Sequence, residues 1–234
     1  MKTTIVIFPM EDEMDELLPK LKEYKKVSYG IIDGIEFTTS RAKKVFAFVS
    51  GIGKTKIGLK IGYLASRLDI EEIFNVGVAG SLVKDIVPLN VVVATKVGYY
   101  DVDVTSGGDL ALGQMTQEPM YFETSKKNLD LIDKLNTTLT IKKGTIITGD
   151  SFATKKNMTP EFLLNFDNPL LVDMESAAVG QCAHDLNIPF TIIRGVSDYI
   201  FAEGNGNMFD EYLPLSARRA ASILLHIIDD PLID

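Results

Sequence analysis

The sequence predicts an α/β fold, a single-domain three-layer sandwich in which helices flank a central mixed β-sheet. Apolar runs rich in β-branched residues alternate along the chain with segments whose apolar residues recur at helical spacing. The chain has 234 residues, of which 46% are hydrophobic, enough to bury a substantial core. No internal repeat, low-complexity tract or linker divides it. We therefore expect one domain that spans residues 1–234.

The first part of the chain is predicted to alternate between buried strands and amphipathic helices. Thr4–Phe8 is an almost unbroken apolar run, typical of a strand that is covered on both faces. Glu11–Tyr24 has its apolar residues at helical spacing, and Val27–Val49 reads as short strands broken by a hairpin turn at Asp33-Gly34. The next helix is expected over Lys56–Leu68.

The rest of the chain repeats this alternation. Runs of β-branched residues predict strands at Ile73–Val78, Val91–Val97, Ile141–Thr148 and Phe190–Val196. Helical spacing predicts helices at Ser125–Leu135, Met174–Leu186 and Asp210–Ile228. Thr105–Tyr121 is glycine-rich, aperiodic and too long for an ordinary connector, so we expect a functional loop or a partner contact there.

Composition argues against several classes of function. The net charge is -8, with no basic stripe that could neutralise phosphodiesters, so we expect no nucleic-acid partner. A single cysteine, Cys182, cannot form a disulfide within the chain or a cysteine-rich metal site. The 2 histidines, His184 and His226, do not have metal-ligand spacing. We therefore expect no metal site.

The hydrophobic pattern does not indicate a membrane protein. No stretch approaches the roughly 18 apolar residues that a spanning helix requires. The apolar run at Ile5–Phe8 is too short for a secretory signal, and acidic residues follow it closely. We expect a cytoplasmic protein.

The segment "SGIGKTKIG", residues 50–58, superficially resembles a phosphate-binding loop. A Walker loop requires a glycine about five positions before Gly53, where this chain has Phe48. A dinucleotide fingerprint requires its third glycine at the position of Lys56. The remaining interpretation is that Gly51 and Gly53 let the backbone approach a ligand or another strand closely at a strand end.

Acidic residues stand at the ends of several apolar strands. Glu13 follows the first strand, Asp173 and Glu175 follow "PLLV", and Asp198 follows "TIIRGVS". Carboxylates are costly to bury unless they are paired, so such residues are either helix caps or site residues. Asp173 is interpreted as the N-cap of the helix that follows it. The position of Glu13 is compatible with a first-turn helix acid or with a site residue. The position of Asp198 favours a site residue.

Converging carboxylates without metal ligands or a nucleophile triad are suited to hydrolysing a glycosidic bond. One acid protonates the leaving group, and another activates water against an oxocarbenium-like transition state. Phe152, in "TGDSF" beside a strand end, could stack on a flat heterocycle or could simply belong to the core.

Eight motifs in order make the chain similar to a known family, nearly from end to end. They are "MEDE", "SGIGK", "NVGVAGS", "DVDVT", "TGDSF", "VDMESAA", "RGVSD" and "FDEYL". With these motifs the chain resembles the 5′-methylthioadenosine/S-adenosylhomocysteine nucleosidases, which have a nucleoside phosphorylase-like fold. The resemblance implies hydrolysis of the N-glycosidic bond with release of adenine and a 5-thio-substituted ribose, by a homodimer that needs no cofactor and serves methionine salvage.

The resemblance also implies a role for individual residues. Glu13 would activate the attacking water, and Asp198, oriented by Ser197, would protonate or hydrogen-bond nitrogen 7 of the purine. Glu175 would hold the ribose hydroxyls. The remaining substrate contacts would be Phe152 stacking on adenine, the Ala153 backbone on its Watson–Crick edge, Met174 and Val78 near the ribose, and Met10, Ile52 and Phe209 along the alkylthio group.

The chain departs from the family pattern at a few positions. Val78 stands where a serine or threonine is usual, Ser81 replaces a glycine, and Pro9 replaces a small residue. Residues 106–120 do not align cleanly with the segment by which one subunit of the family dimer closes its neighbour's pocket. These departures leave the preferred 5′-substituent open.

Three alternatives remain at this stage. A purine nucleoside phosphorylase would need arginines converging on phosphate, and we expect none near the end of the first strand. The arginines of the chain are Arg41, Arg67, Arg194, Arg218 and Arg219. A futalosine-type hydrolase could share Glu13 and Asp198 and differ in its pocket for the 5′-group. A non-catalytic nucleoside-binding relative could keep the fold alone.

Overall fold

A computed structural model describes residues 2–228 of the chain, so the ends of the expected domain, Met1 and residues 229–234, lie outside the described part. The strands are β1 (Thr3–Phe8), β2 (Lys25–Tyr29), β3 (Ile32–Thr38), β4 (Lys44–Val49), β5 (Ile70–Ser81), β6 (Val91–Tyr99), β7 (Phe122–Glu123), β8 (Ile141–Thr148), β9 (Pro169–Asp173) and β10 (Phe190–Tyr199). The helices are α1 (Glu11–Asp15), α2 (Lys54–Ala65), α3 (Lys126–Ile132), α4 (Pro160–Leu163), α5 (Ser176–Asp185) and α6 (Asn205–Ile228).

All strands belong to one mixed sheet. Its order is β10-β6-β8-β9-β5-β1-β4-β3-β2, with β7 paired to β6 and an additional pairing between β10 and β5. β4, β1, β5 and β10 run parallel to one another, so their carboxyl ends meet on one edge. β6 is antiparallel to β10, and β9 is antiparallel to β5. The predicted mixed sheet is confirmed.

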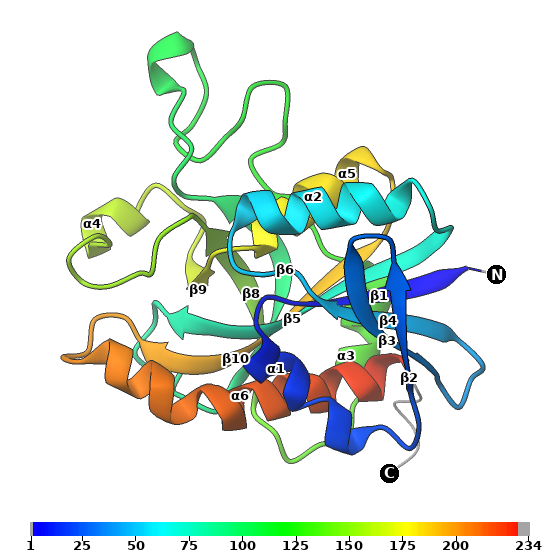
Figure 1. Cartoon of the computed structure of the whole chain (residues 1–234). Coiled ribbons are helices and arrows are strands. Elements are labelled where there is room, and N and C mark those ends of the chain that lie inside the picture. Colours follow the sequence, from blue (N-terminus) through cyan, green and yellow to red (C-terminus); the bar gives the residue numbers. More distant parts are fainter. Residues whose placement is uncertain (1, 229–234) are drawn as a thin grey trace.

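Helices cover both faces of the sheet and produce the predicted three layers (Figure 1). α2 and α5 lie on one face and α1, α3 and α6 on the other. The alternation within β1 explains why its apolar run is continuous: Ile5 and Ile7 join the core under α2 and α5, whereas Val6 and Phe8 join the core under α6.

The N-terminal helix is much shorter than predicted. α1 ends at Asp15, and only a short 3-10 helix, η1 (Leu18–Lys20), follows before β2 begins at Lys25. Pro19 explains the break, because in a continuous α-helix its ring would clash with the carbonyl of Asp15, four residues earlier, and it cannot donate a helical hydrogen bond. The prediction of one helix over Glu11–Tyr24 was therefore wrong.

The predicted hairpin turn was also misplaced. The chain turns between Tyr29 and Ile32, where Gly30 has a φ of 63°. Gly34 lies inside β3, and a Cβ on it would come within 2.4 Å of the Ala47 carbonyl oxygen. Gly34 therefore permits the close approach of β3 to β4 and does not mark a turn.

Two further differences bear on the site. α6 begins at Asn205, five residues before the predicted start at Asp210, within a glycine-rich stretch whose apolar spacing indicated no helix. Residues 106–120, with η2 (Thr105–Gly107) near their start, carry no other regular element and project from the body of the molecule in Figure 1.

Candidate active site

One pocket collects every residue that the sequence singled out for a site. It encloses about 610 Å³ of empty space, part of it open to solvent. Its lining includes Glu13, Asp198, Met10, Ile52, Val78, Phe152, Ala153, Met174, Glu175, Ser197 and Phe209. Glu13 lies in α1 and Phe209 in α6, and the other residues come from the C-terminal parts of strands or from the segments that follow them, at β1, β4, β5, β8, β9 and β10. Hydrophobic side chains with a few convergent carboxyls are typical of small-molecule sites.

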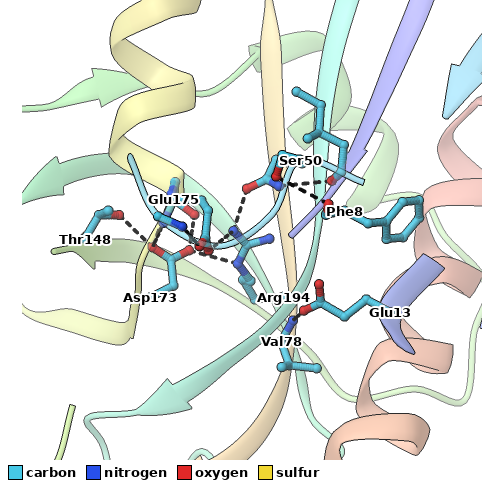
Figure 2. Close-up of polar contacts among 12 residues, drawn as sticks. Phe8, Glu13, Ser50, Val78, Thr148, Asp173, Glu175 and Arg194 are labelled. Carbon is cyan, nitrogen blue, oxygen red and sulfur yellow. Dashed lines mark hydrogen bonds and ion pairs between the residues drawn. The ribbon is translucent and has the colours of Figure 1, made fainter. Parts of the chain in front are cut away.

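Glu13 is buried and held rigidly on one wall of this pocket. Glu13 is 1% exposed. Its Oε1 accepts a hydrogen bond from the Val78 amide at 2.8 Å (Figure 2). Its Oε2 accepts a hydrogen bond from the Met10 amide at 2.9 Å. Burial raises the pKa of Glu13 to about 8, although the charge of Arg194 and the two amide hydrogen bonds act to lower it. Glu13 can therefore exchange a proton near neutral pH.

Glu175 lies beside a buried ion pair. Arg194 is fully buried and donates from Nε to Asp173 Oδ2 at 2.8 Å, while its Nη2 lies 3.9 Å from Glu175 Oε2 (Figure 2). Gly53, in the "SGIGK" turn, donates its amide to Glu175 Oε1 at 2.8 Å. Burial and the neighbouring Asp173 raise the pKa of Glu175, against the charge of Arg194.

Asp173 is not the N-cap residue that the sequence predicted, because α5 begins at Ser176 and its N-cap is Glu175. Its Oδ1 accepts from the amides of Glu175 and Ser176, at 3.3 and 3.2 Å, at the start of α5, and also from the Thr148 hydroxyl at 2.6 Å. Its other oxygen pairs with Arg194. Asp173 therefore both satisfies a helix start and neutralises a buried cation.

The sequence did not reveal the position of Arg194. Arg194 donates to Asn75, whose side chain in turn bonds the Ile7 carbonyl of β1, and its charge acts on Glu13. The expectation that no arginine lies near the end of the first strand was therefore wrong. The available signal was an arginine inside the apolar run "FTIIRGV". Its Nη1 is buried without a protein acceptor among residues 2–228, so this nitrogen is free to donate to water or a hydroxyl.

Asp198 occupies another wall of the pocket at the end of β10. It is 2% exposed, with Ser197 Oγ at 2.8 Å from Oδ1 and Asn205 Nδ2 at 3.1 Å from Oδ2. Burial raises the pKa of Asp198, and the hydrogen bonds from Asn205 and Ser197 lower it less than burial raises it. Sequence reasoning missed Asn205 because it placed the start of the last helix beyond it.

Two apolar zones complete the pocket. At the mouth, Phe152 is 47% exposed and Ile52 is 50% exposed. The Phe152 ring meets the Phe209 ring edge-on, with centroids 5.5 Å apart. Deeper in, Val78 packs in a cluster with Met10 and Phe209. Val78 therefore extends a hydrophobic surface at the position where the family pattern has a hydroxyl.

A polar latch holds the "SGIGK" turn over the pocket. We define it as Lys54, Asp101 and Asp150. Lys54 Nζ lies 2.7 Å from both oxygens of Asp101, the Lys54 amide donates to Asp150 Oδ1 at 3.0 Å, and the Asp150 amide donates to Asp101 Oδ2 at 2.9 Å. The latch joins turns that follow β4, β6 and β8 and thereby supports Ile52 and the Gly53 amide.

Comparison with known proteins identifies the family to which this chain belongs. The sequence pattern of the phosphorylase superfamily matches residues 3–229. The chain is 33% identical to the 5′-methylthioadenosine/S-adenosylhomocysteine nucleosidase of Bacillus cytotoxicus over 230 residues, which cover 96% of this chain and 97% of that protein. This chain belongs to the 5′-methylthioadenosine/S-adenosylhomocysteine nucleosidase family of that superfamily.

Solved structures agree with this nucleosidase family. The nucleosidase from Neisseria meningitidis, crystallised with methylthio-immucillin-A, is 31% identical, superposes with a TM-score of 0.90 and is matched over 97% of this chain and 99% of that one. The futalosine hydrolase of Helicobacter pylori is also similar, at 25% identity and a TM-score of 0.89, over 97% of both chains. The predicted resemblance and the predicted nucleoside phosphorylase-like fold are confirmed.

Proposed function

We propose that this protein hydrolyses the N-glycosidic bond of 5′-methylthioadenosine, S-adenosylhomocysteine or both, releasing adenine and the 5-thio-substituted ribose. One observation carries the proposal. Glu13 and Asp198, 185 positions apart in sequence, are both buried carboxyls that line one pocket. Such a pair supplies an acid for the leaving base and a base for water.

In this proposal Asp198 acts on the leaving base. Its raised pKa keeps a population protonated at higher pH than an ordinary aspartate, so it can donate a proton to nitrogen 7 of the purine as the bond to C1′ breaks. The electron pair of that bond goes to the base. Ser197 orients the carboxyl through its hydroxyl group.

Glu13 acts on the water that captures the sugar cation. Water forms its bond to C1′ and gives a proton to the Glu13 carboxylate. The two backbone amides on Glu13 hold the carboxylate in one orientation, so little reorganisation is required. Because burial raises the pKa of Glu13 to about 8, the ionised form that this step needs increases as the pH rises toward 8, and the nearby charge of Arg194 favours that form.

The other lining residues bind the substrate. We assign the ribose hydroxyls to Glu175, whose carboxylate is fixed by the Gly53 amide. Phe152 stacks on adenine, and the backbone of Ala153 reads its edge. The contacts to the sugar and to the alkylthio group come from Met174, Val78, Met10, Ile52 and Phe209.

Phosphate is a poor candidate for the nucleophile. Among residues 2–228 no arginine lines the pocket. Arg194 is paired with Asp173 and lies near Glu175, and Glu13 would repel an anion beside it. A futalosine-type substrate would require a different fit at the 5′-end, where Met10 and Phe209 make this pocket apolar. A purely binding role would leave no reason for two buried carboxyls with raised pKa values.

The proposal also includes the setting of the enzyme. We propose one nucleosidase domain, a homodimer, a cytoplasmic location, a role in methionine salvage and catalysis without a cofactor. Within residues 2–228, no helix combines the length and apolar character needed to cross a bilayer.

One assay tests the function directly. Purified protein is incubated with 5′-methylthioadenosine, S-adenosylhomocysteine, adenosine and inosine, each with and without phosphate, and free base is measured. We expect phosphate-independent adenine release from the two thio-substituted nucleosides. Asp198→Asn, which cannot donate the proton, should lower kcat by about 100- to 10,000-fold. Near-normal turnover by this variant would contradict the mechanism, and strict phosphate dependence would favour a phosphorylase.

A further inference from the structure

We propose that Asn205 is a positioning residue for the catalytic acid, and that one side-chain amide fixes both the Asp198 carboxyl and the backbone of Ala153. This inference rests on the proposed function, because it assigns Asn205 a task only if Asp198 serves as the acid. Asn205 is the first residue of α6, in the stretch where apolar spacing predicted no helix.

The geometry of the amide is complete. Asn205 is 8% exposed, and its Nδ2 lies 3.1 Å from Asp198 Oδ2 and 3.1 Å from the Ala153 carbonyl oxygen. A primary amide has two N–H hydrogens, and here each has an acceptor. The reverse orientation would place the amide oxygen against a carboxyl oxygen and a carbonyl oxygen. Asn205 is therefore oriented as a double donor to two residues that line the pocket.

The second contact of Asp198 differs in kind. Ser197 Oγ lies 2.8 Å from Asp198 Oδ1 and 3.2 Å from the Ala79 carbonyl oxygen, but a hydroxyl has one hydrogen to donate. Ser197 can donate to the ionised carboxylate, or turn to Ala79 when Asp198 holds the proton. Asn205 donates to Oδ2 whether Asp198 is protonated or ionised. Its hydrogen bond to Asp198 is therefore present in both protonation states.

The hydrogen bond from Asn205 also affects proton transfer from Asp198. When Asp198 loses its proton to the purine, a carboxylate forms in a buried site, where a charge without hydrogen bonds is costly. The bond from Asn205 becomes charge-assisted at that moment and so stabilises the product of the transfer more than the reactant. The same amide holds Ala153, so the acid and the segment that reads the base keep a constant separation.

The pKa of Asp198 can be used to test the role of Asn205, because the other acids of the pocket do not shift it. The other acids of the pocket are Glu13, Asp173 and Glu175, and none of them is a cause of the Asp198 shift. That shift combines burial, which raises the pKa, with the bonds from Asn205 and Ser197, which lower it. Removing the Asn205 donor should therefore raise the pKa of Asp198 further.

The experiment compares Asn205→Ala and Asn205→Asp with the control Asn207→Ala. Asn207 is the same residue type in the first turn of the same helix, but it is exposed. We measure kcat and KM with 5′-methylthioadenosine across pH, and the melting temperature. For Asn205→Ala we expect kcat to fall about 10- to 100-fold, as for loss of a hydrogen bond to a charged group, with a smaller change in KM.

The pH profile separates positioning from a merely structural role. A base at Glu13 and an acid at Asp198 predict a bell-shaped dependence of kcat/KM. In Asn205→Ala, the limb that reports Asp198 should move to higher pH. The limb that reports Glu13 should stay in place, because the substitution alters only the surroundings of Asp198. Asn205→Asp keeps the side-chain shape but replaces the donor with a negative charge, so it should move that limb further. Asn207→Ala should leave both limbs unchanged.

Two results would overturn the inference. One is a fall in activity that follows the melting temperature with both limbs unmoved. The other is an equal effect of Asn207→Ala. Carbon NMR titration of the Asp198 carboxyl in the ligand-free protein tests the same contact without turnover. An unchanged Asp198 titration in Asn205→Ala refutes the inference even if the enzyme is active, whereas absence of adenine release by the wild type refutes the proposed function instead. If Asn205→Ala does not fold, Asn205→Asp supplies the same titration.

Discussion

Gly77 lies in β5 against the carboxylate of Glu13, and its lack of a side chain is required there. A Cβ built at Gly77 would lie 2.4 Å from Glu13 Oε1 and 2.9 Å from its Cδ. Both distances are shorter than any ordinary contact. The carboxylate can keep its hydrogen bond to the next residue, Val78, only because position 77 is glycine.

We therefore predict that Gly77→Ala inactivates the enzyme by displacing Glu13. A shift of about 1 Å in a reacting group can cost 100-fold in rate, so kcat for adenine release should fall at least about 100-fold. Circular dichroism should still report a folded protein, because the added methyl group can be accommodated by rotation of a single side chain.

Gly62→Ala is the matched control for this substitution. Gly62 lies inside α2, and a Cβ there meets nothing within 4 Å. Alanine in a helix interior should stabilise the fold by about 0.5–1 kcal/mol and leave turnover unchanged. Full activity of Gly77→Ala would show that Glu13 tolerates displacement and would argue against its role as the base.

At the scale of elements, the site depends on turns that hold one another across the edge of the sheet. The turn after β4 supplies the Gly53 amide to Glu175, 122 positions away. The latch of Lys54, Asp101 and Asp150 holds that turn to the turns after β6 and β8. Partial exposure limits what each charged pair contributes, so the latch acts through geometry more than through stability.

Lys54→Met should loosen this turn and weaken substrate binding. Loss of the ion pair with Asp101 frees Ile52 and the Gly53 amide, so we expect KM for 5′-methylthioadenosine to rise about 2- to 5-fold, in proportion to a surface pair worth about 1 kcal/mol or less. Steady-state kinetics measure the change, and Lys54→Arg, which keeps the charge, should recover most of the affinity.

Lys126→Met is the comparison for Lys54→Met. It breaks an exposed pair with Asp130 on α3, which contributes no residue to the pocket. Its KM should match that of the wild type. Equal KM values for Lys54→Met and the wild type would mean that the turn keeps its position without the latch.

At the scale of the whole molecule, the pocket remains open at its mouth, where Phe152 and Ile52 are about half exposed. Residues 106–120 project from the body of the chain (Figure 1). A projecting segment and an open pocket fit the proposed homodimer, in which each subunit would cover the pocket of the other.

We predict a mass in sedimentation equilibrium of twice the 25.8 kDa of one chain. A subunit-complementation assay tests whether the sites are shared. Asp198→Asn keeps the projecting segment but lacks the acid, whereas a variant with residues 106–112 replaced by a short glycine linker keeps the acid but lacks the cover. Co-refolding the two variants should restore activity that neither has alone. A monomer, or no recovery in a mixed dimer, would contradict shared sites.

The sequence by itself determined the layers of the fold and the edge at which the site lies. Periodicity distinguishes strands from helices because each must bury one face or both, and polar residues at the ends of apolar strands are costly unless they are used. Glu13, Glu175 and Asp198 could be singled out for that reason, and ordered motifs then connected them to a family and a chemistry.

Only the tertiary structure decided which partners those groups have. Arg194 beneath Glu175, Asn205 beside Asp198 and Gly77 against Glu13 are contacts between segments, or across a turn, that no local pattern encodes. The helix after β1 ended early for a local reason, Pro19, but the role of Gly34 followed from the approach of β4. Buried polar groups are satisfied by whatever the fold places within about 3 Å, so their partners become known only once the chain is folded.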